Sequence, residues 1–262
     1  MTGREGRFRW VDLSARDRVA AQDFYERLFG WTTAELWVTP DIAYTTFSDR
    51  GAMVAGLGEM TEAAIGAGAS SAWASYVTVT DVEVASARAV GLGATLEVAP
   101  TDVFAAGRMA IIADPNGAIV SLWQEGEHIG AERFDKPVSL IWNELNTRRL
   151  DVAIDFYTRM FEWDAEVQTD EGPPYVVFRL DGTMIGGAFE IRPDLPPDLP
   201  DHWLVYFSVA DAAASAALAR SLGATVVGPM DTGANGRFAI VEDPQGAQFC
   251  IFQSLMPGKD DS

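Results

Sequence analysis

Two acidic residues, Asp12 and Glu144, occupy matching places in the sequence, each two residues after a tryptophan. The stretches WVDL (10–13) and WNEL (142–145) both read as short strands, in which residues two apart share one face. Poor solvation beside an indole favours the neutral form of a carboxyl group. Such a group suits general acid or base catalysis near neutral pH, so Asp12 and Glu144 are the candidate catalytic residues.

A second interpretation gives these two carboxylates a structural role. Arg16 and Arg148 follow them closely in the chain, while Arg108 and Arg237 match each other in the repeat described next. An ion pair with one of these arginines, or hydrogen bonds from backbone amides, would satisfy a carboxylate without any chemistry. Both interpretations stay open at the level of the sequence.

The chain contains an internal repeat. Residues 10–31 and 142–163 match at ten of 22 aligned positions without a gap, including the shared Asp-Phe-Tyr. Residues 107–124 and 236–253 match at nine of 18 positions, again around a common motif, Asp-Pro-x-Gly. Since both blocks repeat at nearly the same offset, the sequence predicts two similar domains in tandem.

The predicted domains are 1–126 and 138–262, joined by a polar linker at 125–137 whose Gly and Pro suit a connection. In the first domain a strand precedes a helix over 16–29, whose buried stripe is expected to contain Val19, Ala20, Phe24 and Leu28. A second strand and helix follow, and further strands close on the Asp-Pro-x-Gly turn. This order, βαβββ twice in each domain, predicts an α+β fold. Residues 56–71 and 192–201 are expected to be loops.

These motifs resemble the vicinal oxygen chelate superfamily, which includes glyoxalase I, extradiol dioxygenases and bleomycin-resistance proteins. The resemblance rests on DFYERLFGW and DFYTRMFEW after the first strand of each half, on LGAT at the helix ends, and on the two Asp-Pro-x-Gly turns. It implies tandem glyoxalase-like domains, each with two βαβββ units that form an open half-barrel around a cleft. The fold alone does not fix the activity, because it supports isomerases, lyases, oxygenases and drug-binding proteins.

With such a fold, strand alternation predicts which side chains face helices and which face a cleft. Aliphatic and aromatic residues such as Val11, Leu13 and Phe207 fall on the helix face. Aromatic and polar residues share the other face, a composition typical of a site for a flat, conjugated ligand. The predicted ligand-binding residues are Trp10, Tyr76 and Trp123 in the first cleft, and Trp142, Tyr206, Gln248, Cys250 and Phe252 in the second. The simpler alternative is that these rings only fill the core.

The resemblance also identifies where metal-binding members place their ligands. The corresponding residues here are Trp10, Ala74, Ser121, Trp142, Leu204 and Cys250. A divalent ion needs several His, carboxylate or thiolate ligands together, and only Cys250 among these six could serve. We therefore expect neither a metal nor another cofactor.

One of the two histidines is a candidate for catalysis or metal binding. His202 falls on the cleft face and is a third candidate catalytic residue; together with Glu144 and Cys250 it could also form a displaced metal site. The alternative is that His202 lies at the rim, beside the proline-rich loop. The other histidine, His128, falls in the linker and is expected to be solvated.

Composition narrows the possible partners. The formal charge of −19 over 262 residues repels phosphate backbones and anionic lipids, so nucleic-acid and membrane-surface roles are not expected. One cysteine cannot form an internal disulfide, which is typical of a protein in the reducing cytoplasm. No apolar stretch is expected to be long enough for a signal peptide or a membrane span. The protein is expected to be a monomer with two pseudo-symmetric domains, or a homodimer.

The sequence thus favours a metal-independent enzyme that acts on a planar aromatic small molecule, such as an aromatic polyketide. The expected chemistry is dehydration, cyclisation or isomerisation by acid and base groups. The alternative is a binding protein that sequesters a toxic aromatic compound without transforming it. A metal-dependent lyase or dioxygenase is disfavoured by the residues at the ligand positions.

Overall fold

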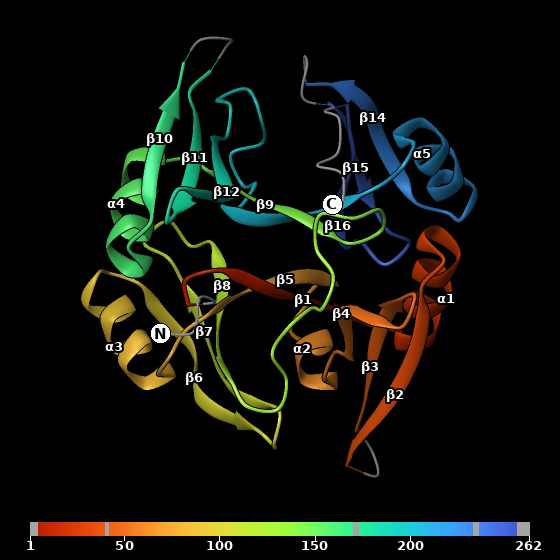
Figure 1. Ribbon diagram of the computed structural model, residues 1–262, viewed down its shortest axis with the longest axis horizontal. Coiled ribbons are helices and arrows are strands. Elements are labelled where there is room, and N and C mark those ends of the chain that lie inside the picture. Colours follow the sequence, from red (N-terminus) through yellow and green to blue (C-terminus); the bar gives the residue numbers. More distant parts are fainter. Residues whose placement is uncertain (1–4, 40–41, 170–172, 233–235, 256–262) are drawn as a thin grey trace, which may run out of the picture. The chain divides into compact units, whose positions relative to one another are not determined.

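Each half of the chain folds as two βαβββ modules. The computed structural model describes residues 5–39, 42–169, 173–232 and 236–255 (Figure 1). The first half contains β1 (Phe8–Ala15), α1 (Arg18–Phe29), β2 (Thr32–Thr39), β3 (Ile42–Asp49), β4 (Ala52–Glu59), α2 (Glu62–Gly66), β5 (Ala72–Thr78), α3 (Val82–Gly91), β6 (Thr95–Val103), β7 (Gly107–Ala113) and β8 (Ile119–Glu125). The second half contains β9 (Leu140–Thr147), α4 (Leu150–Phe161), β10 (Asp164–Gln168), β11 (Tyr175–Leu180), β12 (Thr183–Glu190), β13 (His202–Ser208), α5 (Ala212–Ser221), β14 (Thr225–Asp231), β15 (Gly236–Glu242) and β16 (Gln248–Ser254). The predicted α+β fold is confirmed.

The two halves form two eight-stranded sheets with the same strand order. The first is β2-β3-β4-β1-β5-β8-β7-β6, and the second is β10-β11-β12-β9-β13-β16-β15-β14. Within each module the hairpin strands pair antiparallel, while the first strand pairs parallel with the last, as β9 does with β12. A parallel pair requires a crossover connection, which the helix of the module provides.

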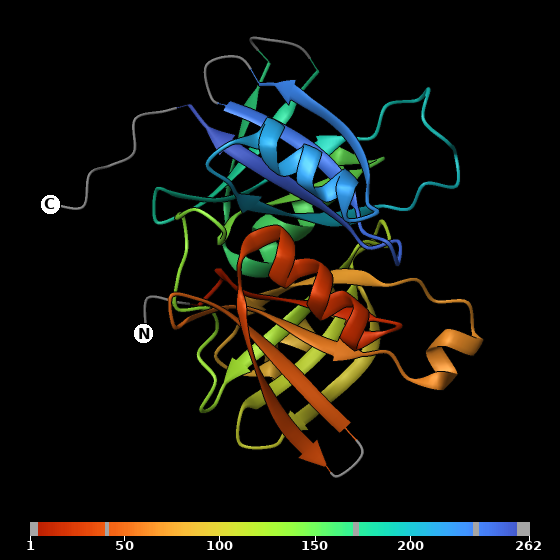
Figure 2. The same ribbon diagram turned by 90° about the vertical axis from the view of Figure 1, so that its right-hand side faces the viewer.

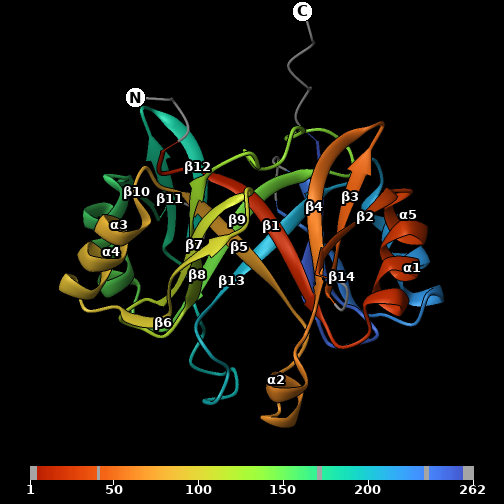
Figure 3. The ribbon, with the colours of Figure 1, turned by 90° about the horizontal axis from the view of Figure 1, so that it is seen from below.

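Packing divides the chain into two compact units. Unit 1 comprises Met1–Trp10, Ala74–Gly130 and Trp142–Leu204, and unit 2 comprises Val11–Trp73, Ala131–Ile141 and Val205–Ser262. Each unit therefore combines one module from each half of the sequence. In unit 1, α3 lies beside α4; in unit 2, α1 lies beside α5 (Figures 2 and 3).

A buried hydrogen-bond chain joins the two modules of unit 1. The indole Nε1 of Trp203 donates to the hydroxyl of Tyr157 at 2.8 Å, and that hydroxyl donates to Asp114 Oδ2 at 3.0 Å. Asp114 opens the Asp-Pro-x-Gly turn, and its Oδ1 accepts the backbone N–H groups of Asn116 and Ala118. The tyrosine of the helix thus bonds to the turn of the other module.

Unit 2 repeats this arrangement with the matching residues. Trp73 Nε1 donates to the Tyr25 hydroxyl at 2.9 Å, which donates to Asp243 Oδ2 at 3.0 Å. Asp243 Oδ1 accepts from the backbone of Gln245 and Ala247. The Asp-Phe-Tyr and Asp-Pro-x-Gly motifs, which dominate the repeat, are therefore partners in space.

One polar pair distinguishes the cores of the two units. Ser75 on β5 donates to the side-chain oxygen of Asn143 on β9 at 2.7 Å in unit 1, and both side chains are buried. The repeat places Val205 and Val11 at the corresponding positions, and both are buried in the apolar core of unit 2. The hydrogen bond satisfies two polar groups that would be costly to bury alone.

The buried strand faces agree with the alternation predicted from the sequence, whereas the predicted buried stripe of helix α1 was partly wrong. Val11, Leu13 and Phe207 are fully buried. Helix α1 begins at Arg18 because Asp17 caps it, accepting a hydrogen bond from the backbone of Ala20. Val19 is 68% exposed and Ala20 is exposed as well; Ala21 and Tyr25 face the core in their place.

The predicted loop at 56–71 was also partly wrong. Strand β4 extends to Glu59, and the short helix α2 occupies Glu62–Gly66. Thr61 caps α2 by accepting a hydrogen bond from the backbone of Ala64. The predicted loop at 192–201 contains no helix or strand, as expected.

Removing the hydroxyl of Tyr157 should destabilise the protein. In Tyr157→Phe, Trp203 loses its acceptor and Asp114 loses a donor, both in a buried setting, so the free energy of unfolding should fall by about 2–4 kcal/mol. Urea unfolding measures this loss. Tyr25→Phe should show a similar loss, and an unchanged free energy in both variants would contradict the role of these bonds.

The same sites predict a pH dependence of stability. Burial raises the pKa of Asp114 and of Asp243 above the ordinary value of 3.8, despite the hydrogen bonds that each carboxylate accepts. A pKa that is higher in the folded state favours folding at low pH, and this contribution is lost as the pH rises from about 4 through the folded pKa. Relative to Asp243→Asn, which cannot ionise, the parent protein should therefore lose stability over that range in urea titrations. A constant difference between the two proteins would contradict the raised pKa.

Candidate functional site

Glu144 lies on β9, at the start of its ladder with β12. The register pairs Glu144 with Gly187 in parallel, and β11 flanks β12 on its other edge. Two residues earlier on β9 is Trp142, and both side chains are half-buried. Alternation places them on the same face of the strand, as the sequence predicts.

A tyrosine that the sequence analysis missed connects these two side chains. Trp142 Nε1 donates to the hydroxyl of Tyr175 at 3.0 Å, and the same hydroxyl donates to Glu144 Oε2 at 2.9 Å. Tyr175 is the first residue of β11 and is half-buried. Burial, followed by the charge of Glu144, raises the pKa of Tyr175 far above its usual value, so the phenol keeps its proton.

The tyrosine fits there because Gly187 has no side chain. A Cβ atom on Gly187 would collide with the hydroxyl and ring of Tyr175. Gly187 faces Glu144 on one side and Val177 of β11 on the other. The absence of a side chain on β12 at Gly187 therefore leaves the space beside Glu144 that the Tyr175 phenol occupies.

Asp12 has a matching partner in unit 2. The hydroxyl of Tyr44 on β3 donates to Asp12 Oδ2 at 3.3 Å, and Asp12 pairs with Gly56 of β4 in the parallel register. Tyr44 lies 32 residues after Asp12, and Tyr175 lies 31 residues after Glu144. Both candidate carboxylates thus accept a hydrogen bond from a tyrosine of their own module.

The arginines suggested as structural partners bind elsewhere. The Arg16 guanidinium donates to the carbonyl of Ala69, and that of Arg148 donates to the carbonyls of Pro196 and Leu199. Arg108 pairs with Asp102 and Glu83, and Arg237 pairs with Asp231. The hypothesis of an ion pair between these arginines and Asp12 or Glu144 was therefore wrong.

The first aromatic set lies in unit 1 and is largely covered. Trp10, Tyr76 and Trp123 are only 4%, 7% and 6% exposed. The rings of Tyr76 and Trp123 meet edge to face at 6.3 Å, and Tyr76 pairs with Ser121 in the parallel ladder of β5 and β8.

The covering residue is His128, for which the expectation of a solvated side chain was wrong. Its ring is half-buried and lies edge-on to Trp10 at 4.4 Å and to Trp123 at 5.7 Å. Trp123 Nε1 donates to the His128 carbonyl. Backbone hydrogen bonds from 126–128 to Ala105 and Ala106 hold this segment in place, so the linker begins as an ordered strap.

The other predicted site residues are divided between the two units. His202 opens β13 in unit 1, where its Nδ1 lies 2.9 Å from the carbonyl oxygen of Pro200 in the proline-rich loop. In unit 2, Tyr206 and Cys250 are buried and pair across β13 and β16. Phe252 is half-buried, whereas Gln248 is exposed and donates to Glu242. The structure thus joins Trp142 to Glu144 through Tyr175, and it joins Tyr206 to Cys250.

The described part of the chain contains no cluster of side chains that could bind a metal ion. Across residues 5–39, 42–169, 173–232 and 236–255, no three His, Cys, Asp or Glu side chains gather in a way that could hold one. Cys250 on β16 is buried and pairs with Tyr206 of β13 in the parallel ladder. The displaced site proposed for Glu144, His202 and Cys250 is not among the groups found.

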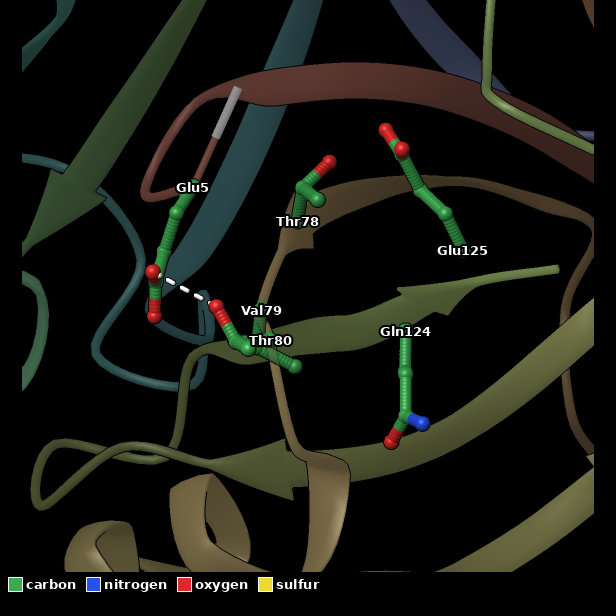
Figure 4. A pocket seen from close by; sticks show the side chains of 6 residues that line it. All are labelled: Glu5, Thr78, Val79, Thr80, Gln124 and Glu125. Carbon is green, nitrogen blue, oxygen red and sulfur yellow. Dashed lines mark hydrogen bonds between the residues drawn. The ribbon is translucent and has the colours of Figure 1, made fainter. Parts of the chain in front are cut away.

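A small polar pocket of about 190 Å³ lies in unit 1 at the end of β5. It is lined by Glu5, Thr78, Val79, Thr80, Gln124 and Glu125 (Figure 4). Glu5 accepts a hydrogen bond from Thr80 at 2.6 Å, and Gln124 caps the start of α3 by accepting from the Val82 backbone. Glu5, Thr80 and Gln124 thus form hydrogen bonds within the fold, and none of the predicted catalytic residues lines the pocket.

Comparison with known proteins identifies the family of this chain. The model of the Glyoxalase/Bleomycin resistance protein/Dioxygenase superfamily matches residues 7–122 and 139–251. The chain therefore belongs to this superfamily, and the predicted family is confirmed, with one matching segment in each half of the repeat.

Two kinds of curated relative align with nearly the whole chain. A protein of Mycobacterium bovis named "Putative glyoxylase CFP32" is 37% identical over 253 residues, covering 95% of each chain. The "Anthracycline biosynthesis protein DauV" of Streptomyces sp. strain C5 is 32% identical over 255 residues, covering 93% of this chain and 92% of that protein. The protein DnrV of Streptomyces peucetius, with the same description, has the same identity and coverage.

Solved structures share the fold at low sequence identity. The 2,3-dioxygenase LapB from Pseudomonas sp. KL28 gives a TM-score of 0.66 at 14% identity, covering 99% of this chain and 97% of that one. The Mn(II)-bound glyoxalase from Novosphingobium aromaticivorans gives 0.63 at 16% identity, covering 96% and 83%. None of the described helices is both long and apolar enough to span a bilayer.

Placing a methyl group on Gly187 should disrupt this site. In Gly187→Ala the new Cβ would displace Tyr175, so the bond to Glu144 should break and the free energy of unfolding should fall by about 1–3 kcal/mol. Gly91→Ala is the control, because a Cβ there meets no atom and alanine favours the helix. Urea unfolding of both variants tests the prediction, and equal stability of Gly187→Ala and the parent would contradict it.

Proposed function

We propose that this protein binds a planar aromatic small molecule and transforms it by acid and base catalysis at Glu144. The observation that supports this most directly is the hydrogen-bonded group of Trp142, Tyr175 and Glu144, which puts a carboxylate beside an indole on a half-buried face. The names of the anthracycline biosynthesis relatives point to an aromatic polyketide as the substrate class.

The chemistry requires only proton transfer. As a base, Glu144 would remove a proton from a carbon next to a carbonyl group, which leaves an enolate. The protonated carboxyl would then return that proton to another atom of the same molecule in an isomerisation, or to a departing hydroxyl group, released as water, in a dehydration. In a cyclisation, the enolate carbon would attack a second carbonyl group of the same molecule, and the protonated carboxyl would give its proton to the alkoxide that forms. Asp12 and His202 remain the other candidate catalytic residues.

The reaction is proposed to be metal-independent. The family positions for metal ligands hold Trp10, Ala74, Ser121, Trp142, Leu204 and Cys250, and indole and aliphatic side chains do not bind divalent ions. This residue chemistry argues against a metal-dependent lyase or dioxygenase. No other cofactor is proposed.

Sequestration of an aromatic compound is the second candidate function. It is supported by the first aromatic set, in which the rings of Trp10 and Trp123 lie edge-on to the ring of His128. Binding alone needs aromatic walls, which bring large apolar area with few rotors to immobilise.

The strong negative charge supports a small-molecule partner rather than nucleic acid or a membrane, and the single cysteine supports a cytoplasmic location. The protein is proposed to work as a monomer with two related halves or as a homodimer. Native mass spectrometry of protein purified from its host without chelators would report the assembly, any bound organic compound and any metal ion. A stoichiometric metal ion would contradict the proposed metal independence.

Glu144→Gln distinguishes the two functions. It keeps the shape of the side chain but cannot ionise, so turnover of an anthracycline aglycone, followed by liquid chromatography and mass spectrometry, should fall at least about 100-fold. Aglycone binding, followed by tryptophan fluorescence, should change little. Asp12→Asn is the matched variant in the first half. Unchanged product formation in both variants would exclude the carboxylate mechanism, and binding without any turnover by the parent would favour sequestration.

A further inference from the structure

We propose that Tyr175 is a positioning residue that holds Glu144 Oε2 as a hydrogen-bond acceptor and thereby prepares this carboxylate to act as a base. The positioning follows from the structure of unit 1. Only the reaction that Glu144 then performs rests on the proposed function.

The phenol of Tyr175 accepts a hydrogen bond from Trp142 and donates one to Glu144. An indole N–H can only donate, so the bond between Trp142 and Tyr175 uses a lone pair of the phenol oxygen. The phenol has a single proton, and its other short contact is Glu144 Oε2 at 2.9 Å. Trp142 therefore turns the proton of Tyr175 toward Glu144, and the order Trp142, Tyr175, Glu144 is fixed. A bond donated to a carboxylate stabilises its charged form.

The tyrosine cannot leave this role by losing its proton. Burial and the nearby Glu144 raise the pKa of Tyr175, so the phenol remains a donor over the range in which a carboxyl group titrates. The ring is also restricted in space. Tyr175 pairs with Phe189 in the β11–β12 ladder, and its hydroxyl occupies the space that a side chain on Gly187 would take.

The first half of the chain supplies a matched comparison. Tyr44 donates to Asp12 over 3.3 Å, a longer contact than the 2.9 Å in the second half. Trp10, which corresponds to Trp142, packs edge-on against His128. A change at Tyr44 therefore tests the effect of losing a phenol without altering the residues around Glu144.

The experiment follows the ionisation of Glu144 directly. The full chain is labelled with glutamate carrying ¹³C in the side-chain carboxyl group, and the Glu144 signal is assigned by its absence in Glu144→Gln. The pH midpoint of this signal is then measured in the parent, Tyr175→Phe, Trp142→Phe and Tyr44→Phe. We expect the midpoint to rise by about one pH unit in Tyr175→Phe, because the charged form loses a donor.

Trp142→Phe keeps the Tyr175 phenol but removes the indole N–H that orients its proton, so we expect a smaller rise of the pH midpoint. Tyr44→Phe should leave the midpoint unchanged. If Tyr175→Phe does not fold, Trp142→Phe decides the question. An unchanged midpoint in every folded variant, or an equal rise in Tyr44→Phe, would overturn the proposal. Loss of the proposed function is a separate outcome, because full turnover by Glu144→Gln would leave the titration result intact.

Discussion

The fold depends on a hydrogen bond from a buried tyrosine to the aspartate of a turn. Tyr157 and Tyr25 are each enclosed by aromatic rings, and each hydroxyl accepts from a tryptophan and donates to Asp114 or Asp243. Leaving any of these groups unpaired in the core would cost about 1–3 kcal/mol. Because the tyrosine and the aspartate come from different halves of the sequence, this bond ties a module of one half to a module of the other. The repeat motifs are thus explained by packing, independently of any chemistry.

The site follows from the same construction. Each strand that buries Leu145 or Leu13 toward a core presents Glu144 or Asp12 on its opposite face. Burying one face is a requirement of the fold, so the other face is free to vary in chemistry. In the second half it holds a carboxylate, a phenol and an indole joined by hydrogen bonds. In the first half the indole of Trp10 contacts the imidazole of His128. A tandem of similar modules can therefore carry two different surfaces on equivalent strands.

The sequence was sufficient to predict the repeat, the strand faces and the pairing of Trp142 with Glu144 on one face, because these follow from local periodicity. It did not reveal Tyr175, although a signal was present: a tyrosine follows each carboxylate by about the same distance, and a longer alignment of the halves would have shown it. His128 was missed for another reason. Its segment is polar and looks like a linker, and only the hydrogen bonds of the strap to Ala105 and Ala106 bring its ring to Trp10.

The sequence could not predict which modules pack together in each unit, because the hydrophobic periodicity of a module is the same whichever module it packs against. The bond between Ser75 and Asn143 bears on this ambiguity. The chain contains four modules of one design, and during folding each meets several possible partners. Were the β9 module to pack on a module with valine at the position of Ser75, the Oδ1 of Asn143 would be buried without the hydrogen bond that Ser75 donates, at a cost of about 1–3 kcal/mol. The pair therefore contributes to specificity: it stabilises the association of the β5 and β9 modules, and it makes the association of the β9 module with other modules less favourable.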